Sequence, residues 1–241
     1  MQKITLISRR EVAPALFELC FTRPEDWVYE AGQFARIGMT LSEGDVFRAY
    51  SIASAPQSAN LTFLIKSVTD GALSPKLCAL TPGDTVMLDG DAQGNLLPAR
   101  IAGDKDVWMM ATGSGLAPFL AMLADPKALA SFDRRLLVIG ARTRAETDQL
   151  ADYAKEKAVV DVEIFTASSR EEGALTGRLP TLIESGDLEA ATKTTFSPEQ
   201  SRILLCGNPD FIRATRAIFK AKGIVSPRLG KPGQLLVESL W

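Results

Sequence analysis

Residues 107–124 have the sequence VWMMATGSGLAPFLAMLA, which contains no charged side chain. A bilayer-spanning helix would not carry Thr-Gly-Ser-Gly and a proline in its middle, so we interpret this stretch as a buried strand, a turn and a helix. Glycines at such a junction let the backbone turn tightly and let an anion approach the helix N-terminus. A strand-to-helix turn without a ligand explains the segment equally well, because Pro118 stands where the dinucleotide-binding fingerprint has its third glycine.

The chain beyond residue 106 alternates between apolar runs of strand length and helical segments. Uninterrupted apolar runs are typical of strands buried on both faces, and their alternation with helices indicates a parallel sheet covered on both sides. We therefore predict an α/β doubly wound parallel sheet over residues 101–241, with a polar connection over 186–199. The expected strands are 107–111, 136–140, 160–166 and 203–206, and the expected helices are 117–124, 148–157, 179–185 and 209–222.

The first 100 residues have a different pattern. Short apolar runs are separated by turn signals such as Thr-Pro-Gly-Asp at 81–84, and one short helix is expected at 74–79. Strands at such intervals favour an antiparallel sandwich or barrel. We predict a two-domain protein, with an antiparallel β-barrel over 1–100 followed by the parallel α/β domain. The apolar runs are 4–7, 16–21, 34–37, 50–53, 61–68 and 85–88.

The composition excludes several classes of chemistry. None of the 241 residues is histidine, so Ser-His-Asp hydrolysis, Cys-His proteolysis and histidine-ligated haem or zinc are ruled out. Three widely spaced cysteines argue against an iron–sulfur cluster, a structural zinc or a disulfide framework, and we expect no metal site. The net charge of −2 argues against a general nucleic-acid binder. Residues 1–10 lack the apolar core of a signal peptide, so we expect a cytoplasmic protein with no membrane partner.

Two short motifs in the first domain offer anion-binding groups. In Arg48-Ala-Tyr-Ser51, strand alternation places Arg48 and Tyr50 on one face, where a guanidinium fork suits a phosphate and a flat ring suits stacking. Ser74 before Pro75 predicts an N-cap with proline at the first helical position. An ordinary exposed Arg–Tyr face and a simple helix start are the alternatives.

Further candidates follow the strands of the second domain. Arg142, Arg170 and Arg178 come where strands are expected to end, and doubly wound sheets bind ligands in the crevice at that edge. Arginine at this edge favours a phosphorylated ribose, although solvated positive charge is the simpler explanation of each residue. The sequence ends at Trp241, a large aromatic that we expect to pack either on the protein core or on a bound ligand.

Together, these motifs resemble one family. Arg-Ala-Tyr-Ser at 48–51, Gly-Ala-Leu-Ser-Pro at 71–75, Ala-Thr-Gly-Ser-Gly-Leu-Ala-Pro-Phe at 111–119, Cys-Gly-Asn-Pro at 206–209 and the aromatic end follow one another as in the bacterial ferredoxin/flavodoxin–NADP(+) reductases. The resemblance spans nearly the whole chain. It implies an FAD domain, an NADP domain and hydride transfer between NADP(H) and FAD, chemistry in which the cofactors supply the reactive atoms.

The resemblance also implies roles for individual residues. Arg48 would bind the FAD pyrophosphate, Tyr50 would stack on the isoalloxazine and Ser51 would bond near its reactive nitrogen; Tyr50, Ser51 and Cys206 are the implied catalytic residues. The other residues implied for FAD are Ala49, Lys66, Ser67, Ala72, Leu73, Ser74, Thr112 and Trp241. Those implied for NADP(H) are Ala141, Arg142, Ser169, Arg170, Arg178, Cys206, Gly207, Asn208, Pro209 and Asp210.

The implied partner is a ferredoxin or a flavodoxin, served by a monomeric reductase. Because such carriers are typically acidic, docking on this slightly acidic chain would require a local basic surface. Leu240 stands where some relatives have an aromatic residue covering the flavin, which leaves the covering group open. A reductase component of an oxygenase and a non-catalytic flavin- or nucleotide-binding protein are the alternative functions.

Overall fold

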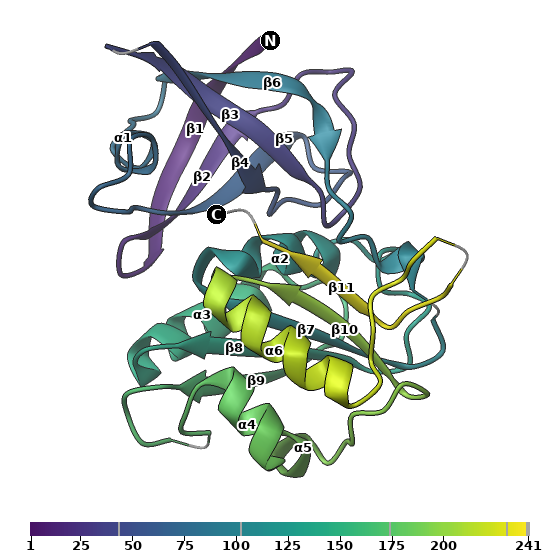
Figure 1. The fold of residues 1–241 in the computed structure, drawn as a ribbon. Coiled ribbons are helices and arrows are strands. Elements are labelled where there is room, and N and C mark those ends of the chain that lie inside the picture. Colours follow the sequence, from purple (N-terminus) through teal and green to yellow (C-terminus); the bar gives the residue numbers. More distant parts are fainter. Residues whose placement is uncertain (43, 102, 174, 230, 240–241) are drawn as a thin grey trace.

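The computed structural model describes residues 1–42, 44–101, 103–173, 175–229 and 231–239. It consists of an antiparallel unit formed by the first part of the chain and a parallel α/β unit formed by the rest (Figure 1). Within the described ranges, no helix has both the length and the apolar character needed to cross a bilayer.

The first unit is a six-stranded antiparallel sheet with the strand order β4-β3-β6-β1-β2-β5. An isolated bridge between Ile52 and Phe63 joins the end of β4 to β5 and closes the sheet on itself, which confirms the predicted barrel. Its interior is apolar, with Phe21 and Phe63 in edge-to-face contact at 6.1 Å between ring centroids. The strands are β1 (Gln2–Ala13), β2 (Leu16–Thr22), β3 (Phe34–Leu41), β4 (Gly44–Ser51), β5 (Asn60–Lys66) and β6 (Thr85–Gln93); a short helix, α1 (Ser74–Cys78), and a 3-10 turn, η1 (Pro98–Arg100), complete the unit.

The second unit is a five-stranded parallel sheet with the order β11-β10-β7-β8-β9. Successive residues of its central strand face opposite cores: Met109 packs with α2 and α3, and Trp108 packs with α4 and α6. This is the predicted doubly wound arrangement. The strands are β7 (Asp106–Thr112), β8 (Arg135–Ala141), β9 (Glu163–Ser168), β10 (Ser201–Cys206) and β11 (Leu235–Glu238), and the helices are η2 (Gly113–Leu116), α2 (Ala117–Leu123), α3 (Arg144–Lys157), α4 (Leu179–Ser185), α5 (Asp187–Thr192) and α6 (Pro209–Ala221).

Several details differ from the sequence prediction, including the longer strands β1 and β4. The expected polar connection contains helix α5, so that prediction was wrong there. Helix α3 starts at Arg144 rather than at 148, because the Thr143 side chain and Glu146 form a capping box. Strand β9 begins at Glu163 rather than at 160, and the edge strand β11 was not anticipated.

The two units share one continuous apolar core. Val12, Leu16 and Leu64 of the barrel pack in the same cluster as Phe119 and Met122 of α2. Ion pairs at the rim of this interface join β1 and β2 of the barrel to α3 of the second unit. The interface therefore fixes how the two units face each other.

Candidate functional site

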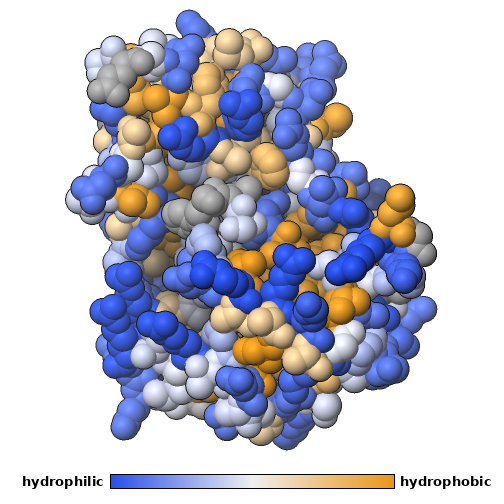
Figure 2. All heavy atoms as spheres, in the orientation of Figure 1, coloured by the Kyte–Doolittle hydropathy of each residue, from blue (hydrophilic) through white to orange (hydrophobic). Residues whose placement is uncertain are grey.

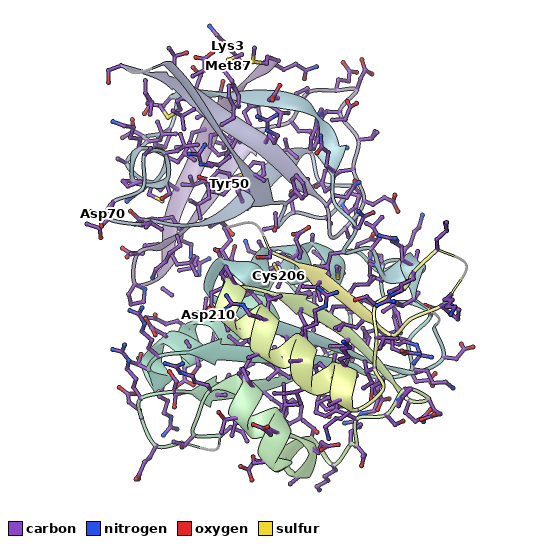
Figure 3. All side chains as sticks on the ribbon, viewed as in Figure 1. Lys3, Tyr50, Asp70, Met87, Cys206 and Asp210 are labelled. Atoms are coloured by element: carbon purple, nitrogen blue, oxygen red, sulfur yellow. The ribbon has the colours of Figure 1, made fainter. Side chains whose placement is uncertain are left out.

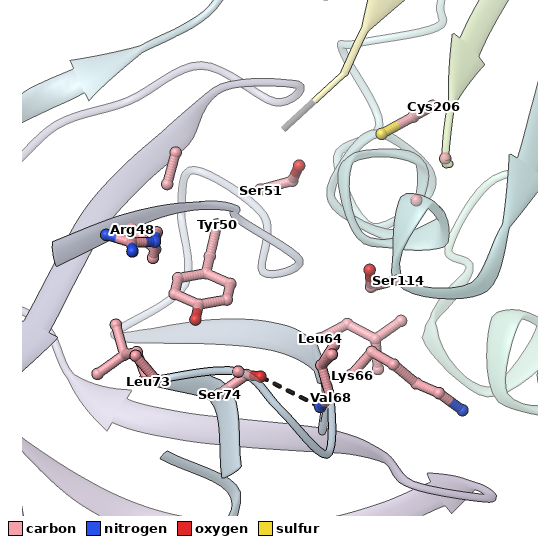
Figure 4. Close-up of a pocket in the computed structure, with 15 residues that line it drawn as sticks. Arg48, Tyr50, Ser51, Leu64, Lys66, Val68, Leu73, Ser74, Ser114 and Cys206 are labelled. Atoms are coloured by element: carbon pink, nitrogen blue, oxygen red, sulfur yellow. Dashed lines mark hydrogen bonds between the residues drawn. The ribbon is translucent and has the colours of Figure 1, made fainter. Parts of the chain in front are cut away.

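A cavity of about 290 Å³ lies where the two units meet (Figure 4). The barrel contributes the end of β4, parts of β5 and the turn before α1, and the second unit contributes η2 and the loop after β10. Ten of the residues implied by the resemblance, together with Gly71, thus line one space although they come from distant parts of the sequence. The lining residues are Arg48, Ala49, Tyr50, Ser51, Leu64, Lys66, Val68, Gly71, Ala72, Leu73, Ser74, Ser114, Gly115, Cys206 and Gly207.

Strand β4 supplies the aromatic ring and the cation of the cavity. Tyr50 extends its ring toward Leu73 and Ser74, and Arg48 lies on the same side of the strand (Figure 4). Burial raises the pKa of Tyr50 to about 12, so its phenol stays protonated at neutral pH. The exposed Arg48 donates to the Phe47 carbonyl at 2.7 Å and is paired with no carboxylate in the described ranges. Its guanidinium therefore has donors left for an anion.

The turn before α1 approaches the same space, but its cap differs from the prediction. Leu73, not Ser74, occupies the N-cap position, and its side chain makes no capping bond. The Ser74 hydroxyl instead accepts from the Val68 N–H at 3.2 Å, drawn as the dashed line in Figure 4. A Cβ on Gly71 would lie 3.0 Å from the Ser74 hydroxyl, so glycine allows this tight turn. Ser74 was wrongly predicted as the cap because its hydroxyl bonds backward along the loop.

A buried polar cluster occupies the junction of the two units. The Ser51 hydroxyl donates to Glu238 Oε1 at 2.8 Å, and Cys206 lies at the facing end of β10, beside β11. Burial raises the pKa of Glu238 to about 7, partly offset by the bond from Ser51. Burial, reinforced by the nearby Glu238 carboxylate, raises the pKa of the Cys206 thiol well above its usual value. The Cys206 thiol is therefore protonated at neutral pH, and the Glu238 carboxyl is protonated below about pH 7.

Sequence reasoning assigned no role to Glu238. Its carboxyl reaches Ser51 only because the four-residue strand β11 pairs with β10 in the register that places Glu238 beside Cys206. The available signal was a carboxylate directly after the apolar run 235–237. Glu238 Oε2 has no hydrogen-bond partner among the described residues, so the cluster has one unused acceptor.

Two glycines allow the loops of the second unit to meet closely behind the cavity. A Cβ on Gly115 would lie 2.2 Å from the Cys206 carbonyl oxygen, and Gly207 has a φ of +155°. The Thr112 hydroxyl accepts from the Asn208 N–H at 3.2 Å, and the Asn208 side chain accepts from the Phe211 N–H and caps α6. Thr112 thus braces the cavity wall from behind rather than lining it. Ser114 and Gly115, which do line the cavity, were not predicted.

Two other implied FAD residues connect to the β1–β2 hairpin. Lys66 lines the cavity with part of its chain, but its ammonium donates to the Pro14 carbonyl. The Ser67 N–H donates to the Ala15 carbonyl at 2.8 Å, and Ser67 is not among the lining residues. Their implied roles along the flavin stay predictions. Leu240 and Trp241 lie outside the described residues.

The arginines implied for the nucleotide phosphate lie at the edge of the parallel sheet. The Ser169 N–H donates to the Ala141 carbonyl and the Arg170 N–H to the Arg142 carbonyl, both at 3.0 Å, so the segments after β8 and β9 run side by side. Arg178 is the N-cap residue of α4. All three arginine side chains are exposed, and no ion pair engages them in the described part of the chain. They are free to bind an anion at this edge.

Asn208, Pro209 and Asp210 belong to the loop after β10 and the first turn of α6. They form the N-terminal start of α6, directly after the cavity-lining Gly207, and Figure 3 shows Asp210 close below Cys206. Asp210 pairs with Arg213 at 2.9 Å. Their implied contact with a nicotinamide stays a prediction.

The comparison with known proteins agrees with this geometry. The oxidoreductase FAD-binding domain family matches residues 3–96, and the oxidoreductase NAD-binding domain family matches residues 109–217. The flavodoxin/ferredoxin–NADP reductase of Escherichia coli strain K12 is 36% identical over 94% of this chain and 93% of its own length. The ferredoxin–NADP reductase of Pseudomonas aeruginosa is 31% identical over 92% and 91%.

A solved structure shows the same arrangement. A ferredoxin NADP+ reductase from Neisseria gonorrhoeae with bound FAD and NADP superposes with a TM-score of 0.90 at 31% identity, covering 100% of this chain and 98% of that chain. The likeness extends across both units, in agreement with the shared core between them. The chain therefore belongs to the family of flavodoxin/ferredoxin–NADP reductases.

Proposed function

We propose that this protein transfers hydride between NADP(H) and FAD, and single electrons between FAD and a ferredoxin or flavodoxin. The observation that carries the proposal is the cavity between the units, which joins an aromatic ring, an unpaired arginine and a buried proton-holding cluster. Flavin exchanges a hydride or single electrons when bound, and this chemistry needs no histidine base.

The cavity residues fit a flavin dinucleotide. Tyr50 provides a flat neutral surface, and Arg48 keeps donors for a pyrophosphate. The turn at Gly71 brings backbone close to the space beside Arg48, and Gly115 does the same from the second unit. The residues that would hold the cofactor are Arg48, Tyr50, Ser51 and the turn formed by Ala72, Leu73 and Ser74.

The cluster of Ser51, Cys206 and Glu238 holds a proton beside the reacting centre. Burial raises the pKa of the Glu238 carboxyl to about 7, and the Ser51 hydroxyl lies 2.8 Å from it toward the cavity. Burial raises the pKa of the Cys206 thiol, so it keeps its proton, and Cys206 lines the same cavity. We infer that Glu238 and Ser51 would hold a proton beside a bound flavin, which would itself supply the redox chemistry.

The exposed arginines at the sheet edge select the coenzyme. Guanidinium forks match the geometry of a 2′-phosphate, which NADPH carries and NADH lacks. Arg142 and Arg170 lie on adjacent segments, and Arg178 begins α4 next to them. NADPH is therefore the expected donor.

The test begins with the visible spectrum of the purified protein. We expect flavin absorbance that heat or acid releases as FAD, and bleaching when NADPH is added without oxygen. A colourless protein that FAD cannot reconstitute would contradict the proposal. Arg170→Ala should lower the ratio of kcat/KM for NADPH over NADH, with the exposed Arg144 at the start of α3 as the matched control.

Reduction of the carrier separates this function from its alternatives. Rapid electron transfer to a ferredoxin or flavodoxin would support the reductase function. Electron transfer only to an oxygenase would instead identify the protein as the reductase component of an oxygenase system. Because one chain supplies both halves of the site, we expect an active monomer, which light scattering of the holoenzyme checks. The free thiols agree with the expected cytoplasmic location.

A further inference from the structure

A second hollow, of about 440 Å³, lies on the outer side of α6 and is separate from the cofactor cavity. Its floor includes Ile212 and Ala217, and its walls carry Arg213, Arg216, Lys220 and Arg228. We call it the α6 groove. Figure 2 shows this face of the molecule, with hydrophilic side chains standing around apolar ones over α6.

The groove concentrates positive charge on a chain whose net charge is −2. The spacing of Arg213, Arg216 and Lys220 places them on one face of α6, and Arg228 faces them from the following loop. Asp210 pairs with Arg213 at 2.9 Å, whereas in the described ranges no carboxylate pairs with Arg216, Lys220 or Arg228. Like charges that line one hollow repel each other, and a bound acidic partner would offset this repulsion.

The groove begins where the cofactor cavity ends. Pro209 at its near end comes two residues after Gly207, which lines the cavity. Ser239, at the same end, directly follows Glu238, whose carboxyl accepts from Ser51. A macromolecule seated in the groove would therefore lie next to the cofactor cavity.

The surroundings of the groove have the composition of a protein interface. Leu229, the neighbour of Arg228 in the chain, is fully exposed, and Val225 is 41% exposed. Arginine beside exposed apolar side chains is typical of protein-binding surfaces, whereas a phosphate-only ligand would have no use for the apolar part.

We propose that the α6 groove is the docking surface for an acidic protein electron carrier. This inference rests on the proposed function and names the surface that the carrier uses. The carrier's carboxylates pair with Arg216, Lys220 and Arg228, and an apolar rim around its redox centre contacts Leu229. Charge pairing steers the encounter and orients the carrier toward the cavity.

The experiment compares two double charge reversals in the holoenzyme. Arg216→Glu with Lys220→Glu changes the groove. Lys105→Glu with Lys127→Glu changes net charge equally away from the groove, because Lys105 precedes the central strand β7 and Lys127 follows α2, which packs on the other face of the sheet from α6. The measured quantities are kcat/KM for a ferredoxin and a flavodoxin, kcat/KM for a small uncharged quinone, and the calorimetric affinity of the oxidised carrier.

We expect the groove variant to lose about tenfold or more in kcat/KM and affinity for the carrier at low ionic strength. The loss should shrink as salt rises beyond about 0.15 M, where the Debye length is about 8 Å. Quinone reduction with NADPH should stay unchanged in both variants, and the control variant should keep most of its carrier activity.

Several outcomes would overturn the inference. Equal losses in both variants would assign the effect to net charge, and a parallel loss of quinone reduction would place the groove in nucleotide binding. If the groove variant kept its carrier kinetics but lost binding of a short DNA duplex, the groove would be assigned to nucleic acid. If it kept its carrier kinetics but lost a dimer that the wild type forms, the groove would be assigned to a second copy of the chain. A wild-type enzyme that reduces the quinone but neither carrier would instead contradict the carrier half of the proposed function, and the inference would fall with it.

Discussion

The barrel and the parallel sheet bury their apolar side chains in different ways. The barrel core is self-contained, formed by residues between Ile4 and Leu88. The parallel sheet has a core on each face, and the one under α2 and α3 continues into the barrel through Val12, Leu16 and Leu64. The cofactor cavity lies along this shared core. Packing in this shared core, rather than a few polar contacts, therefore sets the distance between the Tyr50 wall and the Cys206 wall.

The sharpest test uses two neighbours on β5 that face the two different cores. Leu64 and Ile65 are both buried, but Leu64 belongs to the shared core and lines the cavity, whereas Ile65 belongs to the barrel core alone. Truncation to alanine should lower the free energy of unfolding by about 2–5 kcal/mol in each case. Only Leu64→Ala should also weaken FAD binding and slow flavin reduction by NADPH.

Urea unfolding gives the stability of the two variants, and flavin fluorescence gives FAD dissociation. If Ile65→Ala loosens FAD as much as Leu64→Ala at equal stability, the cavity depends on the barrel as a whole. The shared core would then have no special part in shaping the site.

The buried carboxyl at the junction makes stability depend on pH. The pKa of Glu238 is raised from 4.5 to about 7 in the folded protein. The stabilisation of the folded state by the neutral Glu238 carboxyl is fully present below pH 4.5. It is lost as pH rises through about 7, because the folded state then buries a charge. At pH 8 the loss amounts to about 3 kcal/mol.

Glu238→Gln removes this titration and keeps a group that can bond to Ser51. The variant should therefore gain stability over the wild-type FAD-free protein at pH 8 and not at pH 5, measured by urea unfolding at both values. A difference that is the same at both pH values would show that Glu238 is already ionised at pH 5.

Much of this architecture could be predicted from sequence because its signals are local. The alternation of apolar strands with helices identified the parallel sheet, and turn-separated runs identified the barrel. The cavity wall at Arg48–Ser51 followed from strand alternation and from the resemblance. Helix α5 was missed because its polar composition looks like a loop, although Asp187 starts it after the left-handed Gly186.

The parts that could not be predicted depend on contacts between distant segments. Glu238 gains its role only through the pairing of β11 with β10. Ser74 was expected to cap α1, but the competing partner was the Val68 N–H in the preceding loop. The basic groove likewise needs Arg228 of a loop to face α6. No local pattern encodes these juxtapositions.

A smaller effect is expected for the arginine of the cavity. Arg48→Ala should weaken FAD binding by roughly 1.5–3 kcal/mol, the contribution of a charge-assisted hydrogen bond to a phosphate. Arg36→Ala is the matched control, since Arg36 lies on the adjacent strand β3 and pairs with Asp89 at 2.9 Å instead. Equilibrium dialysis of FAD compares both with the wild type. Equal weakening in the two variants would count against a phosphate contact at Arg48.

The smallest expected effect concerns the ion pair at the rim of the interface. Arg10 and Glu156 pair across the two units at 2.9 Å, but 52% and 46% of their side chains are exposed. Exposed pairs contribute only about 0.2–1 kcal/mol, because water and salt screen them. If packing holds the units together, this pair should add no more than that.

A double-mutant cycle isolates the pair from its other contacts. Arg10 also lies 5.5 Å from the centroid of the Tyr153 ring, so Arg10→Ala alone removes a second interaction. The coupling between Arg10→Ala and Glu156→Ala cancels that contribution, because the ring contact is lost in both arms of the cycle. We expect a coupling of about 0.2–1 kcal/mol that disappears at about 1 M salt, where the Debye length is about 3 Å. A larger coupling that persists in salt would mean that charges, and not the shared core, fix the two units around the cavity.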